Sequence, residues 1–296
     1  MNRPPATISV DVDPVDLHLV GYGFPGLAPD PLAYTAALPR LLERFAAHGV
    51  RATLFIVARD AGAHADVLRA ARAAGHEIAC HSMTHPLGIA SLEPEGRRRE
   101  LAESKAVLER TLGADIAGFR APNFDMDEPT LGELATLGYR YDASSYPSPL
   151  LLPARLVLAL KSRDKLGVLK LKPWPFDWRR TPHRRAGGRL VEFPATVTPG
   201  TRIPIYHTLR YGLGDARFAA AIDGLARGAH PLSYLMHAVD ALGLAEDRVD
   251  PRLAPHPGMN RPLAAKLALL DRTLAAIAAR YDCVTFAERV ARREVA

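Results

Sequence analysis

Two groups of polar residues, each at the end of an apolar run, are placed to bind a metal ion together. Asp11 and Asp13 end the first run. Because successive side chains of a strand alternate, both carboxylates project from the same face. His81 and His85 follow the second run, and imidazoles four residues apart can close on one cation where a strand turns towards a helix. One aspartate with two histidines leaves open positions on a divalent ion, and the second aspartate can act as general base, so the pattern indicates a hydrolytic metal site.

Each half of this pattern also has an ordinary structural interpretation. An aspartate at a strand end is often a helix N-cap or a turn residue, and histidines four apart occur by chance on helix surfaces. The segment 81–85 reads H-S-M-T-H, so it lacks the glutamate of the H-E-x-x-H protease motif. The coincidence of both halves favours a metal site of another class.

The rest of the chain predicts the framework that must position these residues. Its 296 residues are 48% hydrophobic and 24% charged, and apolar segments alternate with helical stretches, which is typical of a large α/β domain with parallel strands. We expect strands at 6–12, 51–57, 77–80, 116–119, 139–141, 190–197, 233–236 and 284–286. We expect helices near 31–48, 62–74, 94–112, 129–137, 215–227 and 262–280. The candidate polar residues fall at or after strand ends, which is the catalytic end of an α/β barrel.

Charge and hydropathy restrict the partners and the location. The net charge of +6 and the pI near 9.5 suit an anionic partner such as phospholipid headgroups or phosphorylated substrates, or else an arginine-rich solvated surface. The basic run at 97–99 is interleaved with glutamates, so we expect no nucleic-acid partner. No apolar run of roughly 18 residues and no secretory signal is present, and we expect a cytoplasmic protein, with association at the inner face of the membrane as an open alternative.

Six segments resemble the polysaccharide deacetylase family, also called carbohydrate esterase family 4 or NodB-homology proteins. They are S-V-D-V-D at 9–13, H-S-M-T-H at 81–85, F-R-A-P-N-F at 119–124, G-Y-R-Y-D-A-S at 138–144, L-M-H at 235–237 and C-V-T-F-A-E at 283–288. The resemblance covers the chain except the region near 150–185. It implies a distorted (β/α)7 barrel, here expected as one catalytic domain over 1–296 with an apolar and basic insertion at about 147–188.

One departure from the family concerns the two aspartates. Most members have adjacent aspartates followed by glycine, whereas here Val12 separates the pair and Pro14 follows it. This D-x-D form resembles a branch that includes peptidoglycan-deacetylase-like proteins and the formyl-arabinose-lipid deformylase. The resemblance implies Asp11 as general base and Asp13 as metal ligand, with the reversed roles left open and Asp16 as a weaker third candidate.

The resemblance also implies the other site residues. Asp13, His81 and His85 would hold a divalent ion, with Zn²⁺ expected first and Co²⁺, Ni²⁺ or Mn²⁺ also compatible with this ligand set. A backbone N–H near residue 123 would bind the oxyanion, although Asn123 stands where the family has an aromatic residue. The residues expected to contact substrate are Pro122, Asn123, Phe124, Trp174 and Trp178.

Three further residues would support the catalytic groups. His237 would protonate the leaving amine, Arg120 would orient Asp11, and Asp142 would orient His237 and raise its pKa. Each has a simpler interpretation: Arg120 as a surface residue, Asp142 as a turn residue, and His237 as a core histidine satisfied by Asp240. Of the remaining histidines, which lack such partner spacing, only His256 in its P-H-P-G turn is expected to border the pocket.

The segment at 150–180 combines apolar residues, Trp174, Trp178 and several Lys and Arg. It resembles an interfacial element that lies on an anionic membrane or grips a lipid chain. A helix packed on the barrel and followed by a strand explains the same pattern equally well.

Together these features predict a metal-dependent amide hydrolase that removes an N-acetyl or N-formyl group from an amino sugar, expected to be lipid-linked. The alternatives are a peptidoglycan or oligosaccharide N-deacetylase, a metal-independent ring-amide hydrolase of the allantoinase-like type, and a non-catalytic sugar- or lipid-binding protein on the same fold.

Overall fold

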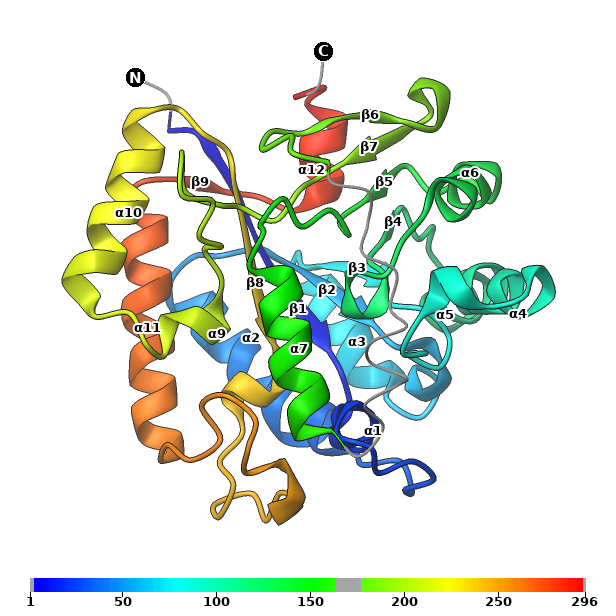
Figure 1. Ribbon diagram of the computed structural model, residues 1–296, viewed down its shortest axis with the longest axis horizontal. Helices are drawn as coiled ribbons and strands as arrows, with labels where there is room; N and C mark the ends of the chain where they lie inside the picture. Colours follow the sequence, from blue (N-terminus) through cyan, green and yellow to red (C-terminus); the bar gives the residue numbers. More distant parts are fainter. Residues whose placement is uncertain (1–2, 163–176, 295–296) are drawn as a thin grey trace.

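A computed structural model describes residues 3–162 and 177–294, and in these residues nine strands form one curled sheet (Figure 1). The strands are β1 (Pro5–Val12), β2 (Ala52–Ile56), β3 (Glu77–Cys80), β4 (Gly118–Phe119), β5 (Tyr141–Asp142), β6 (His183–Arg185), β7 (Leu190–Glu192), β8 (Leu232–His237) and β9 (Asp282–Cys283). Their order is β6-β7-β5-β4-β3-β2-β1-β8, with β9 paired to β1. The strand pairs are parallel except β6–β7. The fold is the distorted (β/α)7 barrel that the sequence predicts.

Helices connect the strands and cover the outside of the sheet (Figure 1). They are α1 (Val15–Gly21), α2 (Leu38–Ala47), α3 (Ala65–Ala73), α4 (Pro94–Arg98), α5 (Ser104–Leu112), α6 (Glu128–Thr136), α7 (Leu151–Lys161), α9 (His207–Arg210), α10 (Asp215–Arg227), α11 (Leu263–Ala278) and α12 (Phe286–Ala291). The six predicted helices are present, most of them shorter at one or both ends, and α1, α7, α9 and α12 are additional. Among the described residues, no helix combines the length and hydropathy that crossing a bilayer requires.

Strand β1 pairs with three strands, β2, β8 and β9, and is buried along almost its whole length. Its neighbours β2 and β8 both run parallel to it, so the carboxyl ends of the three strands lie together. The register pairs Asp11 with Phe55 on one side and with His237 on the other. The strand pairing itself therefore brings the end of β8 to the first aspartate motif.

The last helix closes the amino end of the barrel. The Phe286 ring lies 4.8 Å from the Phe193 ring and 5.4 Å from the Tyr141 ring, centre to centre. Thr285 and Glu288 form a capping box that starts α12 at Phe286. The prediction of a strand at 284–286 is therefore wrong: β9 ends at Cys283, and Thr285 is already the N-cap of α12.

The segment after β7 completes the barrel by joining β8. The Thr196 N–H donates to the Ser233 carbonyl (3.3 Å), and the Ser233 N–H donates to Thr196 Oγ1 (2.7 Å). Strand β6, which the sequence did not predict, forms the antiparallel hairpin with β7 that follows the insertion.

Gly118 gives a test of this packing, because a Cβ there would come within 1.8 Å of Cζ of the buried Tyr141 ring. We expect Gly118→Ala to lower the free energy of unfolding by about 1–3 kcal/mol, since overpacking forces neighbouring groups to shift. The control is Gly132→Ala inside α6, where a Cβ has no neighbour within 4 Å. That variant should be neutral or up to about 1 kcal/mol more stable. Urea unfolding measures both, and equal destabilisation of the two variants would contradict the packing described.

Candidate metal centre and catalytic groups

The predicted polar residues meet at the carboxyl ends of the strands. Asp11 is the last residue but one of β1, and His237 is the last residue of β8. His81 directly follows β3 and Arg120 directly follows β4. The strands that the sequence separates by tens of residues thus deliver their terminal side chains to one place, as the barrel rule predicts.

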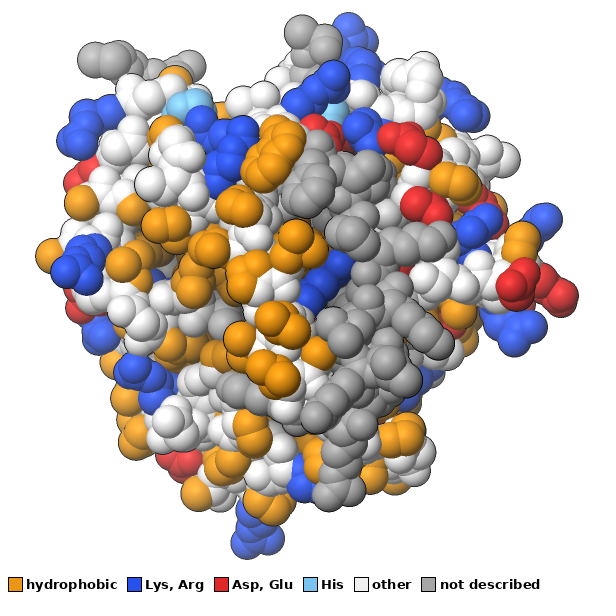
Figure 2. Space-filling model, viewed as in Figure 1, with side chains coloured by type: hydrophobic (Ala, Val, Ile, Leu, Met, Phe, Trp, Pro, Cys, Tyr) orange, Lys and Arg blue, Asp and Glu red, His pale blue; other side chains and the backbone are white. Residues whose placement is uncertain are grey.

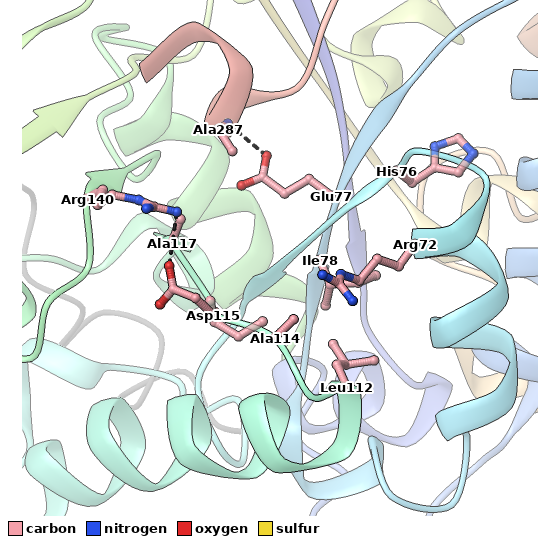
Figure 3. Close-up of a pocket in the computed structure, with 11 residues that line it drawn as sticks. Arg72, His76, Glu77, Ile78, Leu112, Ala114, Asp115, Ala117, Arg140 and Ala287 are labelled. Atoms are coloured by element: carbon pink, nitrogen blue, oxygen red, sulfur yellow. Dashed lines mark hydrogen bonds and ion pairs between the residues drawn. The ribbon is translucent and has the colours of Figure 1, made fainter. Parts of the chain in front are cut away.

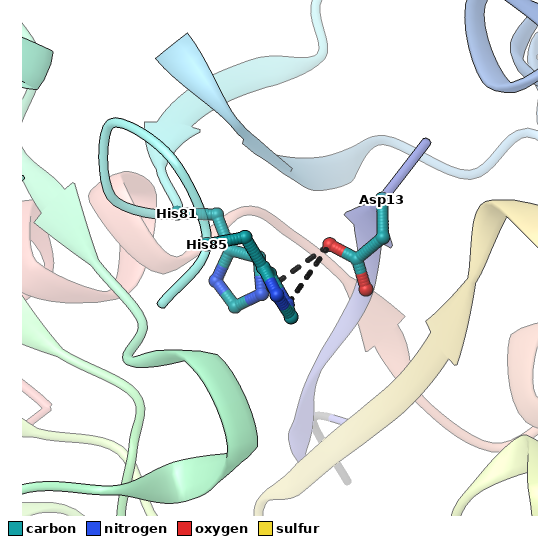
Figure 4. A group of neighbouring side chains, drawn as sticks. All are labelled: Asp13, His81 and His85. Carbon is teal, nitrogen blue, oxygen red and sulfur yellow. Dashed lines mark ion pairs between the residues drawn. The ribbon is translucent and has the colours of Figure 1, made fainter. Parts of the chain in front are cut away.

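Asp13, His81 and His85 form a compact group whose potential ligand atoms all lie within 4.8 Å of one another. Asp13 Oδ1 lies 3.4 Å from His81 Nε2 and 3.7 Å from His85 Nε2. The carboxylate and the two imidazoles point towards one another from β1 and from the loop after β3 (Figure 4). These separations suit three ligands that share one ion at bond lengths of about 2.0–2.2 Å.

The protonation of these groups also fits a metal. The Nδ1–H of His81 donates to the Arg120 carbonyl (2.8 Å), which leaves Nε2 free to coordinate. Burial lowers the pKa of His81, and it lowers the pKa of His85 to about 4, so both rings are neutral as ligands must be. Asp13 Oδ1 is buried and has no hydrogen-bond partner among the described residues. A divalent cation would satisfy this oxygen.

The loop that carries the two histidines is bent by a buried glutamate. The carboxylate of Glu100 accepts the N–H groups of Met83 and Thr84, both at 2.8 Å. Ser82 and His85 both have positive φ angles, and the His85 N–H donates to Ser82 Oγ. Side chains in the left-handed region cost free energy, and this loop keeps that geometry at the position where it turns His85 towards Asp13.

Arg120 contacts Asp11 as predicted. Its Nη1 donates to Asp11 Oδ1 at 2.6 Å, its Nη2 to Ser9 Oγ at 3.0 Å, and its Nε to the Ala143 carbonyl at 3.0 Å. Burial opposes ionisation of Asp11, but the guanidinium and the nearby imidazoles outweigh it, so the pKa of this carboxyl is lowered. Asp11 is therefore ionised, as a general base must be.

His237 lies on the other side of Asp11, with its Nε2 at 4.0 Å from Asp11 Oδ2. Asp240 fixes the backbone at this point, since its Oδ2 accepts the His237 N–H at 2.9 Å. The ammonium of buried Lys266 donates to the carbonyls of Val239 and Leu242, both at 2.7 Å. These bonds hold the turn that positions the imidazole at the site.

The predicted role of Asp142 is wrong. His237 Nδ1 has no hydrogen-bond partner among the described residues, so this ring is not held by Asp142. Its carboxylate instead accepts Ser144 Oγ (2.7 Å) and is hydrogen-bonded to Glu192. Burial raises the pKa of both carboxyls, most strongly that of Glu192, beside the Asp142 carboxylate. Ser144 in turn accepts the Ala121 N–H (2.8 Å), so Asp142 anchors the loop after Arg120.

The predicted substrate contacts have different surroundings. Pro122 is buried, while Asn123 and Phe124 are half-buried and both have φ near +55°. The Phe124 ring lies 4.8 Å from the Tyr146 ring. Trp178 is exposed and lies under the Arg202 guanidinium, 4.5 Å from its centre, whereas Trp174 falls outside the described residues. Contact of these residues with substrate stays a prediction.

The sequence interpretation overlooked His18. This partly buried residue of α1 has its Nε2 3.9 Å from Asp13 Oδ2 and no hydrogen-bond partner on that atom among the described residues. Its ring lies 5.0 Å from His256 and 5.9 Å from His237. Burial, with the neighbouring imidazoles, lowers the pKa of His18 well below its usual range. His256 thus lies near the site, as predicted from its rigid turn.

Asp16, the third candidate aspartate, has a structural role. Its Oδ2 accepts Arg59 Nη2 at 2.5 Å, and its Oδ1 accepts the Asp30 N–H at 3.0 Å. Both of its oxygens are engaged, so neither the base nor the ligand role passes to Asp16.

A cavity lies at the opposite end of the sheet, where the strands begin (Figure 3). Three of its charged groups are already engaged: Arg140 pairs with Asp115 at 3.0 Å, and Glu77 accepts the Ala287 N–H at 3.0 Å. It has no connection to the metal ligands, which lie beyond the carboxyl ends of the strands.

Comparison with known proteins supports this description of the site. The family model "Polysaccharide deacetylase" matches residues 29–141, which include His81, His85 and Arg120. The chain is 30% identical over 114 residues to a chitin deacetylase of Colletotrichum lindemuthianum, a match that covers 37% of this chain and 44% of that protein. The match therefore spans less than half the length of this curated relative.

Solved structures support the fold over the whole chain. A polysaccharide deacetylase structure from Mycobacterium smegmatis, described as putative in its name, superposes with a TM-score of 0.62 at 19% identity, covering 100% of this chain and 93% of that one. The Puue allantoinase superposes with a TM-score of 0.61 at 16% identity, covering 98% and 90%. With the motifs at the ends of β1, β3, β4 and β8 and the matching barrel, these comparisons support the resemblance of the chain to the polysaccharide deacetylase family, the NodB-homology proteins of carbohydrate esterase family 4.

Proposed function

We propose that this protein is a metal-dependent hydrolase that removes an N-acetyl or N-formyl group from an amino sugar carried on a lipid. The observation that supports this most directly is that three potential metal ligands and a separate, ionised carboxylate lie side by side. Asp13, His81 and His85 converge as ligands, while Asp11 lies beside them, ionised by Arg120 and not needed as a ligand. Metal binding alone needs no second carboxylate, whereas hydrolysis needs a base.

The residues divide the chemistry between them. A divalent ion held by the three ligands would polarise the amide carbonyl and lower the pKa of a water molecule. Asp11 then accepts a proton from the attacking water. His237, 4.0 Å from Asp11, gives a proton to the departing nitrogen, which is otherwise a poor leaving group. A backbone N–H at Asn123 would stabilise the developing oxyanion.

The lipid-linked substrate is supported by the position of α7. Arg155 of this helix donates to the carbonyl of Asn123 at 2.9 Å, which attaches α7 to the loop after Arg120. The outward face of α7 is apolar and lies in the most basic part of the chain. A substrate with a sugar head, an anionic linker and an apolar tail would suit this neighbourhood.

Release assays on a panel of N-acylated compounds test the proposal. The panel contains N-acetyl and N-formyl amino sugars, free and linked to a prenyl phosphate, an acetylated chitooligosaccharide, a peptidoglycan fragment and allantoin. We expect acetate or formate from the amino sugars, fastest from the prenyl-linked compounds. Preference for peptidoglycan or the oligosaccharide would correct the substrate class, and hydrolysis of allantoin alone would overturn the proposal. Binding without release from any compound would favour a binding protein.

Metal binding should depend on the three predicted ligands. We expect one divalent ion per chain in the wild type and affinity at least about 100-fold lower in His81→Ala and His85→Ala, because each removes a coordinate bond. The control is His48→Ala, whose ring pairs with Asp271. Titration with Co²⁺, followed by its absorption spectrum, measures the affinities, and unchanged binding in the first two variants would contradict the assigned ligands.

The two aspartates should separate ligand from base. Asp11→Asn should keep the metal and lose about 100-fold to 10,000-fold in kcat, since the proton acceptor is removed. Asp13→Asn should lose the metal first and activity as a consequence. Metal analysis with kinetics on the best substrate measures both. Metal loss in Asp11→Asn with retention in Asp13→Asn would show that the roles are reversed.

The acid limb of the pH profile should depend on Arg120. A base acts only when ionised, so activity falls as the pH drops through its pKa. Arg120→Gln removes the charge that lowers the pKa of Asp11 and leaves the burial that raises it, so the limb should move to higher pH. Arg120→Lys keeps a positive charge beside Asp11, so its acid limb should lie between those of the wild type and Arg120→Gln. Profiles of kcat/KM measure this, and a limb at unchanged or lower pH would contradict the assignment of Asp11.

A further inference from the structure

Exposed hydrophobic side chains are concentrated in one stretch of the chain. Among the described residues, the eight most exposed large hydrophobic side chains all fall between 150 and 209. Five of them, between 41 and 67% exposed, belong to α7 or the residue before it: Leu150, Leu152, Leu156, Val157 and Leu160. We call these five residues the α7 surface. Figure 2 shows hydrophobic side chains gathered where Figure 1 places α7.

The orientation of α7 is the reverse of that of an ordinary surface helix. Its buried side chains include Arg155 and Ala159, four residues apart, and Ser162 just after the helix is also buried. The leucines at 152, 156 and 160 repeat with the same spacing on the outside. A helix on a globular protein normally turns its apolar stripe inwards. An apolar stripe kept outwards marks an interaction site.

The same stretch carries the positive charge of the molecule. Residues 143–214 contain 13 Lys and Arg and 3 Asp and Glu, whereas the rest of the chain contains 25 and 29. The whole net charge of +6 therefore originates in this quarter of the sequence. Asp177 and Glu192 among its acids and Arg155 and Arg210 among its bases have buried side chains, so burial leaves the excess of basic residues in place. An anionic partner would be attracted to this region.

Two more exposed apolar residues adjoin the start of α7. Arg202 donates to the carbonyls of Pro147 and Trp178, at 3.2 and 3.0 Å, and so connects them to the approach to α7. Trp178 and the neighbour of Arg202, Ile203, are both more than 40% exposed. Tryptophan and arginine beside exposed leucines are typical of surfaces that enter a lipid interface.

We propose that the α7 surface docks this protein on an anionic lipid bilayer, with the leucines in the interface and basic residues of the same stretch, Arg202 among them, at the headgroups. Two copies that met through this surface would bring two strongly positive regions together, so charge disfavours a second copy as its occupant. The link from Arg155 to Asn123 would place the bilayer beside the site. The docking rests on the proposed function only in that it explains how a lipid-borne substrate arrives there.

Co-sedimentation of the full chain with vesicles tests the docking. We expect binding to vesicles of phosphatidylcholine with 30 mol% phosphatidylglycerol, at least tenfold weaker binding to pure phosphatidylcholine, and weaker binding at high salt. The double variant Leu156→Asp/Leu160→Asp should lose at least tenfold in partition, and Leu156→Ser/Leu160→Ser should lose binding without any change in charge. The control is Ala264→Asp/Ala268→Asp on exposed positions of α11, which adds the same charge elsewhere and should bind like the wild type.

Three results would overturn the docking. Equal partition of the wild type and the α7 variants, or failure of the wild type to bind anionic vesicles, would do so. A dimer in light scattering that the α7 variants dissolve would assign the surface to a second copy. Release of acetate or formate from a water-soluble amino sugar is measured on the same samples and should be equal in all of them. Vesicle binding without any release would refute the proposed function and leave the docking intact.

Discussion

The buried ion pair between Arg120 and Asp11 is the interaction on which the site depends. A buried charge pair is costly unless its remaining polar atoms are satisfied, and here the guanidinium also donates to Ser9 and Ala143 and lies 4.0 Å from the centre of the Phe55 ring. The same residue accepts the Nδ1–H of His81 at its carbonyl. Arg120 therefore keeps the proposed base ionised with its side chain and sets the tautomer of a proposed metal ligand with its backbone.

These contacts work only because the sheet brings distant strands into register. Arg120 follows β4, and its partner Asp11 lies on β1. The next residue, Ala121, donates its N–H to Ser144, whose hydroxyl donates to Asp142 on β5. At the amino end of the barrel, Phe286 of α12 packs against Tyr141 of β5 and against Phe193, which follows β7. The apolar core thus fixes the strand ends, and the strand ends fix the polar groups. Helix α7 lies outside this core with its leucines at 152, 156 and 160 exposed.

The sequence predicted the parts of the structure that local patterns determine. Alternating apolar and helical segments gave the barrel, and the spacing of Asp13, His81 and His85 at strand ends gave the ligand group. The partner of Asp142 was wrong because its carboxylate is engaged by Ser144, as the turn interpretation of this residue implies, and by Glu192 on the neighbouring strand, which spacing along the chain does not reveal. His18 was missed because it lies on α1, a seven-residue helix too short to show periodicity. The outward face of α7 was undecided because its apolar residues fit burial and exposure equally well.

The central claim is that amide hydrolysis occurs at an ion held by Asp13, His81 and His85. The most direct test titrates metal-stripped protein with Zn²⁺ while acetate or formate release from the best amino-sugar substrate is recorded. The account predicts no release without metal and a rise that stops at one equivalent per chain. Release that is unchanged after the metal is removed would contradict it and would place the protein with metal-independent amide hydrolases on the same barrel.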